Sequence, residues 1–243
     1  MTHILALDTT SKYASLAIAK GTEILVEYNF AIGEELSAAL LPSLGFILKE
    51  AGLKPADIDV YGITTGPGLF TGIRVGLATL KGLLFGMNKP VVAVTTLEAA
   101  ALKCLEQCRK QESVVIPLID ARRSEVYMAG YDCRGGDLKE IFSPRLIPIT
   151  GLREELRGLR GKAGKQALFF TGSGAAVHEA YLAETFPKGD ILQRSFFLAP
   201  EVCKITWERY SAGNYLEDLQ LLMPVYIRKP DAEVNYRGAA ARK

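Results

Sequence analysis

The sequence predicts an α/β protein built from two copies of one motif, with a mixed β-sheet in each copy. An apolar run with an aspartate at its end, followed by a polar turn, occurs twice, at Ile4–Thr9 and at Val114–Asp120. A glycine-rich turn between an apolar run and a helical pattern also occurs twice, at Gly66–Gly68 and at Thr171–Gly174. The order strand-strand-strand-helix-strand-helix-strand fits both copies and indicates one sheet and one core per copy.

The first copy opens with alternating apolar residues and tight turns, which predict an antiparallel meander. The next segment has an apolar stripe at helical spacing, and Pro42 inside it should kink or restart that helix. The expected elements are strands Ile4–Thr9, Tyr13–Lys20 and Glu23–Phe30, helix Glu34–Ala51, strand Val60–Thr65, helix Phe70–Phe85, strand Pro90–Val94 and helix Thr96–Gln107.

The second copy repeats this order with few identical residues. Its expected elements are strands Val114–Asp120, Glu125–Tyr131 and Leu138–Phe142, helix Gly151–Arg160, strand Gln166–Phe170, helices Ala175–Phe186 and Pro200–Ala212, and an extended piece, Met223–Arg228. We therefore expect one lobe over residues 1–108, a second over 109–228, and a flexible basic tail over 229–243.

Composition places the chain among ordinary globular proteins. It has 243 residues, a net charge of +2 and four scattered cysteines, which favour a reducing compartment over a disulfide scaffold. The first residues lack the basic region and apolar core of a signal peptide, and no stretch is a convincing membrane span. We expect a cytoplasmic protein.

The helix Phe70–Phe85 is apolar on nearly every side and contains Gly72, Gly76 and Gly82, with Gly86 just beyond it. A glycine in a helix interior costs about 1 kcal/mol relative to alanine. These residues therefore indicate that something approaches the helix closely. Either the preceding glycine loop holds a phosphate, or the small-residue face holds a partner helix.

Asp8 and Asp120 could face each other across a cleft between the copies and hold a divalent cation with nucleotide phosphates. Neighbouring hydroxyl and backbone N–H groups could then contact the phosphates. The alternative is that each aspartate caps its own turn. The candidate nucleotide-binding residues are Asp8, Thr9, Thr10, Gly66, Gly68 and Asp120.

No dedicated metal site or nucleophile is expected. The two histidines, His3 and His178, are isolated, and Cys104 and Cys108 alone do not complete a zinc site. No cysteine, serine or lysine has a credible base and orienting group nearby in sequence.

Several motifs occur in a characteristic order along the whole chain: Asp8-Thr9-Thr10, Leu40-Leu41-Pro42, the string GPGLFTGIRVG at 66–76, Ile119-Asp120-Ala121-Arg122 and Pro224-Val225-Tyr226-Ile227-Arg228. Together they resemble the bacterial TsaB family, also called YeaZ. The GPGxFTGxRxG string is the most specific part of this resemblance.

The resemblance implies the ASKHA fold of actin, heat-shock chaperones and sugar kinases, with two ribonuclease-H-like lobes. It implies a noncatalytic paralogue of TsaD, the subunit that transfers threonylcarbamoyl to N6 of adenosine 37 in tRNAs reading codons that begin with A. It also implies pairing with a TsaD-like subunit, a TsaE-like ATPase as a further partner, a homodimer when alone, and tRNA bound through the complex.

In the resemblance the first two helices form the pairing surface. The interface residues that it implies are Leu36, Leu40, Leu41, Leu44, Ile73, Arg74, Gly76, Leu77, Leu80 and Leu84. No cofactor is required by this chain, and ATP or ADP could bind where it meets its partner. The alternative function is a nucleotide-dependent kinase or ATPase using Asp8 and Asp120.

Overall fold

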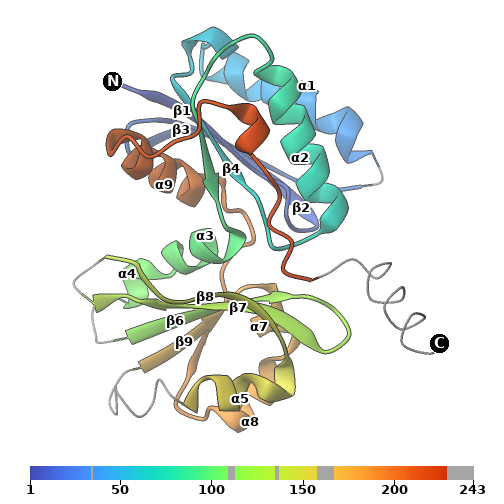
Figure 1. Ribbon diagram of the computed structural model, residues 1–243, viewed down its shortest axis with the longest axis vertical. Coiled ribbons are helices and arrows are strands. Elements are labelled where there is room, and N and C mark those ends of the chain that lie inside the picture. The colour runs from blue at the N-terminus through green and yellow to red at the C-terminus, as the bar shows by residue number, and fades with distance from the viewer. Residues whose placement is uncertain (34, 109–112, 135–136, 158–166, 229–243) are drawn as a thin grey trace, which may run out of the picture.

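The computed structural model describes residues 1–33, 35–108, 113–134, 137–157 and 167–228. Two α/β lobes lie one above the other, and each contains a five-stranded mixed sheet (Figure 1). The predicted basic tail, 229–243, lies outside the described residues.

The two sheets have the same topology. The first has the order β3-β2-β1-β4-β5 and the second the order β8-β7-β6-β9-β10. In each, the first strand pairs antiparallel with the second and parallel with the fourth. The strands are β1 (His3–Asp8), β2 (Tyr13–Lys20), β3 (Glu23–Ala31), β4 (Val60–Thr64), β5 (Val91–Val94), β6 (Ser113–Asp120), β7 (Glu125–Asp132), β8 (Lys139–Pro148), β9 (Ala167–Thr171) and β10 (Asp190–Leu192). The predicted internal duplication is confirmed.

The helices cover both faces of each sheet. They are α1 (Leu36–Glu50), α2 (Phe70–Leu83), α3 (Thr96–Leu102), α4 (Leu105–Cys108), α5 (Leu152–Glu155), α7 (Ser173–Val177), α8 (Glu179–Thr185) and α9 (Ala199–Ser211), with 3₁₀ turns at Pro55–Asp57, Ile149–Gly151 and Leu219–Leu221. On β1, Leu5 and Leu7 face α1 and α2, whereas Ile4 and Ala6 face α9.

Four local predictions need correction. Helix α1 runs without a break through Pro42, because Pro42 is exposed and water can satisfy the carbonyl that its missing N–H leaves free. The segments predicted as single helices at 96–107 and 175–186 are each two short helices. Strand β10 was not predicted, since three residues are too few to show a periodic pattern.

One helix from each half packs on the other half's sheet. Helix α9 packs Val202 and Cys203 against the first sheet, and α3 packs Leu97 and Ala101 against the second. Figure 1 shows α9 beside β1 in the upper lobe and α3 next to the lower sheet. The ranges 1–108 and 109–228 therefore do not coincide with the packing units, because sequence order carries no information about this exchange.

The glycines at the start of α2 make room for the turn after β1. A Cβ at Gly72 would overlap the carbonyl oxygen of Thr9, and one at Gly76 would overlap the Thr9 hydroxyl. The Thr9 hydroxyl donates a hydrogen bond to the Gly72 carbonyl at 2.8 Å, and Leu69 N–H donates to Thr10 O at 2.6 Å. At these positions, the close approach inferred from the sequence is that of the lobe's own turn and not of a partner helix.

We predict opposite effects for two glycine-to-alanine variants of α2. Gly72→Ala should lower the free energy of unfolding by about 2–3 kcal/mol, because the new methyl group overlaps backbone. Gly82→Ala, its matched control, has nothing within 4 Å and should raise it by about 0.5–1 kcal/mol. Urea unfolding measures both, and equal effects of the two variants would contradict the packing described for Gly72.

Candidate functional site

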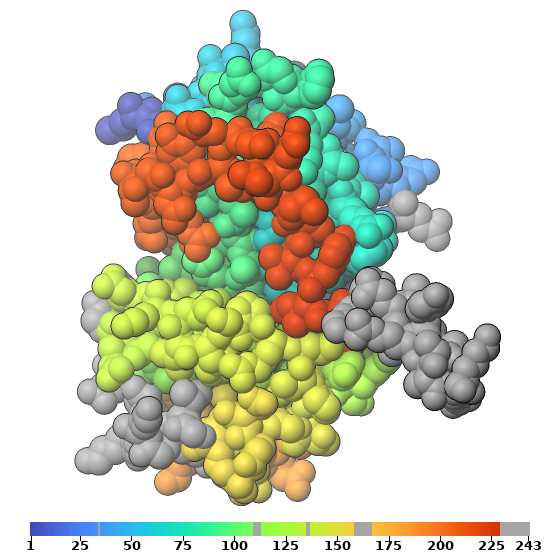
Figure 2. Space-filling view, in the orientation of Figure 1, coloured from blue at the N-terminus to red at the C-terminus, as the bar shows by residue number. Residues whose placement is uncertain are grey.

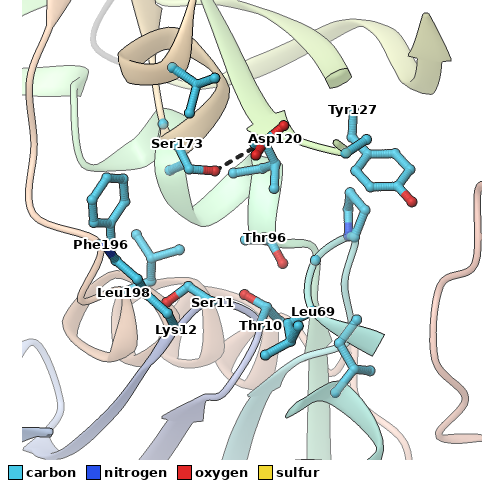
Figure 3. A pocket seen from close by; sticks show the side chains of 18 of the residues that line it. Thr10, Ser11, Lys12, Leu69, Thr96, Asp120, Tyr127, Ser173, Phe196 and Leu198 are labelled. Atoms are coloured by element: carbon cyan, nitrogen blue, oxygen red, sulfur yellow. Dashed lines mark hydrogen bonds between the residues drawn. The ribbon is translucent and has the colours of Figure 1, made fainter. Parts of the chain in front are cut away.

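A cavity of about 970 Å³ lies between the two lobes. Its walls come from the turn after β1, the start of α2, the turn after β6, the start of α7, and the segments 194–198 and 225–228. Figure 3 shows Lys12 and Thr10 from the first lobe and Asp120 and Ser173 from the second at this cavity. A cavity of this size can hold a drug-sized or nucleotide-sized molecule.

Asp8 lies behind this cavity and does not line it. It is fully buried, and its Oδ1 accepts hydrogen bonds from Thr10 N (3.0 Å), Thr10 Oγ1 (2.7 Å) and Thr64 Oγ1 (2.6 Å). Burial raises the pKa of the Asp8 carboxyl, although the hydrogen bonds from Thr64 and Thr10 act in the opposite direction. Asp8 therefore caps its own turn and ties β1 to β4.

Asp120 holds the equivalent turn in the second lobe but is open to the cavity. Its Oδ1 accepts a hydrogen bond from Arg122 N at 2.8 Å, as Asp8 accepts one from Thr10 N. Its own N–H donates to Ser173 Oγ at 3.0 Å. The duplicated aspartates thus share a turn-capping role, and only the second one can meet a ligand in the cavity.

The structure separates the six predicted nucleotide-binding residues into two groups. Thr10, Gly68 and Asp120 line the cavity. Asp8, Thr9 and Gly66 do not, which corrects their prediction as ligand contacts. The Thr9 hydroxyl is bonded to α2, and the Gly66 carbonyl accepts from Thr96 N at 2.9 Å at the start of α3.

The cavity also has basic residues that sequence reasoning did not place there, among them Lys12 and Arg122. Arg122, Arg123 and Ser124 all have φ between 55° and 59°. Three consecutive non-glycine residues in this left-handed conformation are costly, and such strain concentrates at functional sites. Although the turn contains no glycine, its backbone adopts the conformation that glycine usually supplies.

Most of the predicted interface side chains are part of the first lobe's core. Seven of them are at most 5% exposed: Leu36, Leu40, Leu44, Ile73, Leu77, Leu80 and Leu84. Gly76 faces Thr9 inside the lobe. The prediction that these eight residues contact a partner is therefore wrong, because the stripe that marks a helix as amphipathic also marks the side that it buries.

The outer faces of α1 and α2 carry other residues. Leu41, which was predicted, is 53% exposed, and Phe46 and Phe85, which were not, are 47% and 88% exposed. Ala78 and Gly82 are exposed between them in sequence. We call Leu41, Phe46, Ala78, Gly82 and Phe85 the outer helix face. The sequence could have indicated this exposed face, because these apolar residues fall outside the stripe of residues that each helix buries.

Arg74, which the resemblance implied as an interface residue, packs against two residues that line the cavity, Phe70 and Tyr226. Its Nε donates a hydrogen bond to Tyr226 Oη at 2.8 Å, and its guanidinium carbon lies 3.8 Å from the centre of the Phe70 ring. It therefore joins the glycine-loop motif to the C-terminal motif, 152 residues apart in sequence.

Among the residues that the structure describes, no group of three or more histidine, cysteine or acidic side chains is arranged to hold a metal ion. In the same residues no helix is both long and apolar enough to cross a membrane.

The comparisons with known proteins give the family. A family model described as TsaD, tRNA N6-adenosine threonylcarbamoyltransferase, matches residues 32–236. The chain belongs to this family. Within it, the resemblance to TsaB is confirmed: the tRNA threonylcarbamoyladenosine biosynthesis protein TsaB of Haemophilus influenzae is 27% identical, over 99% of this chain and 98% of its own.

Solved structures agree with the family and with the predicted fold class. YeaZ from Pseudomonas aeruginosa superposes with a TM-score of 0.76 and 25% identity, covering 93% of this chain and all of its own. An inorganic polyphosphate/ATP-glucomannokinase from Arthrobacter superposes with a TM-score of 0.53 at 10% identity, covering 87% of this chain and all of its own. This second likeness shows the fold alone, and it confirms the predicted ASKHA architecture.

We predict that Asp8→Asn changes the pH dependence of stability. Because burial raises the pKa of Asp8 above its ordinary 3.8, the unfolded chain releases this proton first as the pH rises. Asp8 therefore lowers the free energy of unfolding increasingly from about pH 4 upward. The variant lacks this loss, so its stability relative to the native chain should increase with pH.

Urea unfolding of both chains at several pH values between about 4 and 7 measures this difference. A constant difference across that range would show that Asp8 titrates alike in the folded and unfolded chains.

Proposed function

We propose that this chain is a noncatalytic subunit in the synthesis of N6-threonylcarbamoyladenosine at position 37 of tRNAs that read codons beginning with A. It pairs with a TsaD-like subunit, which carries out the transfer. The observation that carries the proposal is the outer helix face of α1 and α2, which exposes Leu41 and Phe85 on a protein of this family. Exposed apolar patches of this kind mark interaction sites.

The position of Asp8 supports a noncatalytic role. A kinase or ATPase using Asp8 and Asp120 needs both carboxylates near the nucleotide phosphates. Asp8 is fully buried behind the cavity, and its Oδ1 already accepts three hydrogen bonds. ATP hydrolysis by the purified chain that is abolished by Asp8→Asn would favour the enzymatic alternative.

The remaining parts of the proposal are those that the resemblance to TsaB implied. A TsaE-like ATPase joins the pair, tRNA binds through the complex, and the chain alone forms a homodimer through the same outer helix face. The complex works in the cytoplasm. No catalytic cofactor is required by this chain itself.

We predict that Leu41→Asp and Phe85→Asp disrupt pairing with the TsaD-like subunit. A charge placed at an apolar contact should weaken the complex at least about tenfold, while both side chains are exposed enough for the fold to tolerate the change. Leu221→Asp is the matched control, since Leu221 is 65% exposed outside the outer helix face. Co-purification with the TsaD-like subunit and urea unfolding measure the two effects.

Normal co-purification of both variants would show that the partner binds elsewhere. Variants at Leu40 or Gly76 do not serve this test, because Leu40 is fully buried and Gly76 contacts Thr9, so both would report on folding.

The proposal includes ATP or ADP, which we expected where the chain meets its partner and which the cavity between the two lobes of this chain is large enough to hold. Lys12 and Arg122 line the cavity from opposite lobes and supply positive charge for phosphates. Titration of ADP into the complex should give binding that is at least about tenfold weaker with Arg122→Ala, as expected for a charge-assisted contact. Unchanged affinity, or no binding to the complex, would remove this part of the proposal.

A further inference from the structure

Phe70, Arg74 and Tyr226 form an exposed cluster, which we call the aromatic platform. The Phe70 and Tyr226 ring centres lie 5.3 Å apart at an interplanar angle of 32°. The Arg74 guanidinium lies 3.8 Å from the Phe70 ring centre and 5.7 Å from that of Tyr226. The residues Phe70 and Tyr226 nevertheless remain 48% and 42% exposed.

The chain holds this platform in place from both lobes. Phe70 and Arg74 lie one turn apart at the start of α2, the helix fixed by the Thr9 turn. Tyr226 lies on the C-terminal segment, where Val225 N–H donates to Thr65 O at 2.8 Å in the first lobe. Two residues later, Arg228 forms an ion pair with Glu125 of the second lobe. Figure 2 shows this segment crossing the junction of the lobes.

Cationic side chains lie on the same cavity as the platform. Phe70, Tyr226, Lys12 and Arg122 all line it, Lys12 from the first lobe and Arg122 from the second. Elsewhere on its wall, Lys103 is paired with an acidic side chain, Glu201. Neither Lys12 nor Arg122 has an acidic partner within the part of the chain that the structure describes.

Exposed aromatic faces next to unpaired cations suit single-stranded nucleic acid. An unstacked base packs on the aromatic or guanidinium plane while cations contact the phosphates, and each stacked base contributes about 1–3 kcal/mol. A protein partner would be expected to match both cations with acids and to cover the rings, whereas RNA supplies phosphates for the cations and flat bases for the rings in one strand. The combination therefore favours RNA whose bases are not paired.

We propose that the aromatic platform, with Lys12 and Arg122, binds the unpaired loop of the tRNA directly. This inference rests on the proposed function, which makes tRNA the substrate of the complex. It assigns to this chain a contact with the RNA, by stacking of a loop base on Phe70 and Tyr226, in addition to its pairing with the catalytic subunit.

The test is fluorescence anisotropy with an RNA hairpin that has the sequence of an anticodon stem and loop, titrated with the full chain and with its complex with the TsaD-like subunit. Phe70→Ala and Tyr226→Ala should each weaken RNA binding roughly fivefold or more. Arg74→Lys, which keeps the charge but loses the planar group, should also weaken it. Tyr215→Ala is the matched control: Tyr215 is also an exposed tyrosine packed at a tilt against a neighbouring ring, Tyr210, but it does not line the cavity.

Four outcomes would overturn the proposal. The platform variants could bind the hairpin as tightly as the native chain does, or native chain and complex could both fail to bind it. Equal binding of the hairpin and of the same strand annealed to its complement would show charge attraction without stacking. ADP could also displace the hairpin, and Phe70→Ala could lose its affinity for ADP. Those two results together would show that the platform binds the free nucleotide.

Pairing is measured on the same variants by co-purification. Phe70→Ala should pair normally with the TsaD-like subunit. Loss of pairing in the native chain would refute the proposed function, whereas normal pairing with unchanged RNA affinity of the variants would refute only the RNA contact.

Discussion

The hydrogen bonds of the turn that follows β1 fix the positions of β4 and α2 in the first lobe. The Asp8 carboxyl accepts hydrogen bonds from the Thr10 and Thr64 hydroxyls. These bonds fix the turn and join β1 to β4. The Thr9 hydroxyl then bonds to the backbone of α2 at Gly72, at a distance that only glycine permits. Because α2 carries Phe70 and Arg74 at one end and the outer helix face along its length, this one turn positions both candidate binding surfaces.

Ion pairs between helices α3 and α9 hold the two lobes together, in addition to the connecting chain. Helices α3 and α9, each packed on the sheet of the other half, are linked to each other by two ion pairs, Arg209 with Glu98 at 2.7 Å and Lys103 with Glu201 at 3.0 Å. Burial raises the pKa values of Glu98 and Glu201, and the cations Arg209 and Lys103 act in the opposite direction. Such partly buried pairs specify one arrangement of the helices, since separating them would leave a buried charge without its partner.

The two equivalent turns, one in each lobe, differ in their access to the cavity. Both aspartates cap equivalent turns, yet Asp8 is fully enclosed and Asp120 faces the cavity. The first turn is enclosed by α2, whose glycines allow a close approach, while the second contains three left-handed residues and presents Arg122. The symmetry of the strands therefore does not extend to the chemistry at their ends, and a symmetric pair of metal-binding carboxylates is not formed.

The sequence by itself determined the duplicated α/β fold, the order along the chain of all the described strands except β10, and the family, because these depend on local periodicity and on motifs that can be read along the chain. It also indicated that α2 is closely approached. Only the tertiary structure decided what approaches it, which residues of α1 and α2 remain exposed, and that α3 and α9 are exchanged between the lobes. Those features depend on contacts between residues far apart in sequence, such as Arg74 with Tyr226, and periodicity within one element does not encode them.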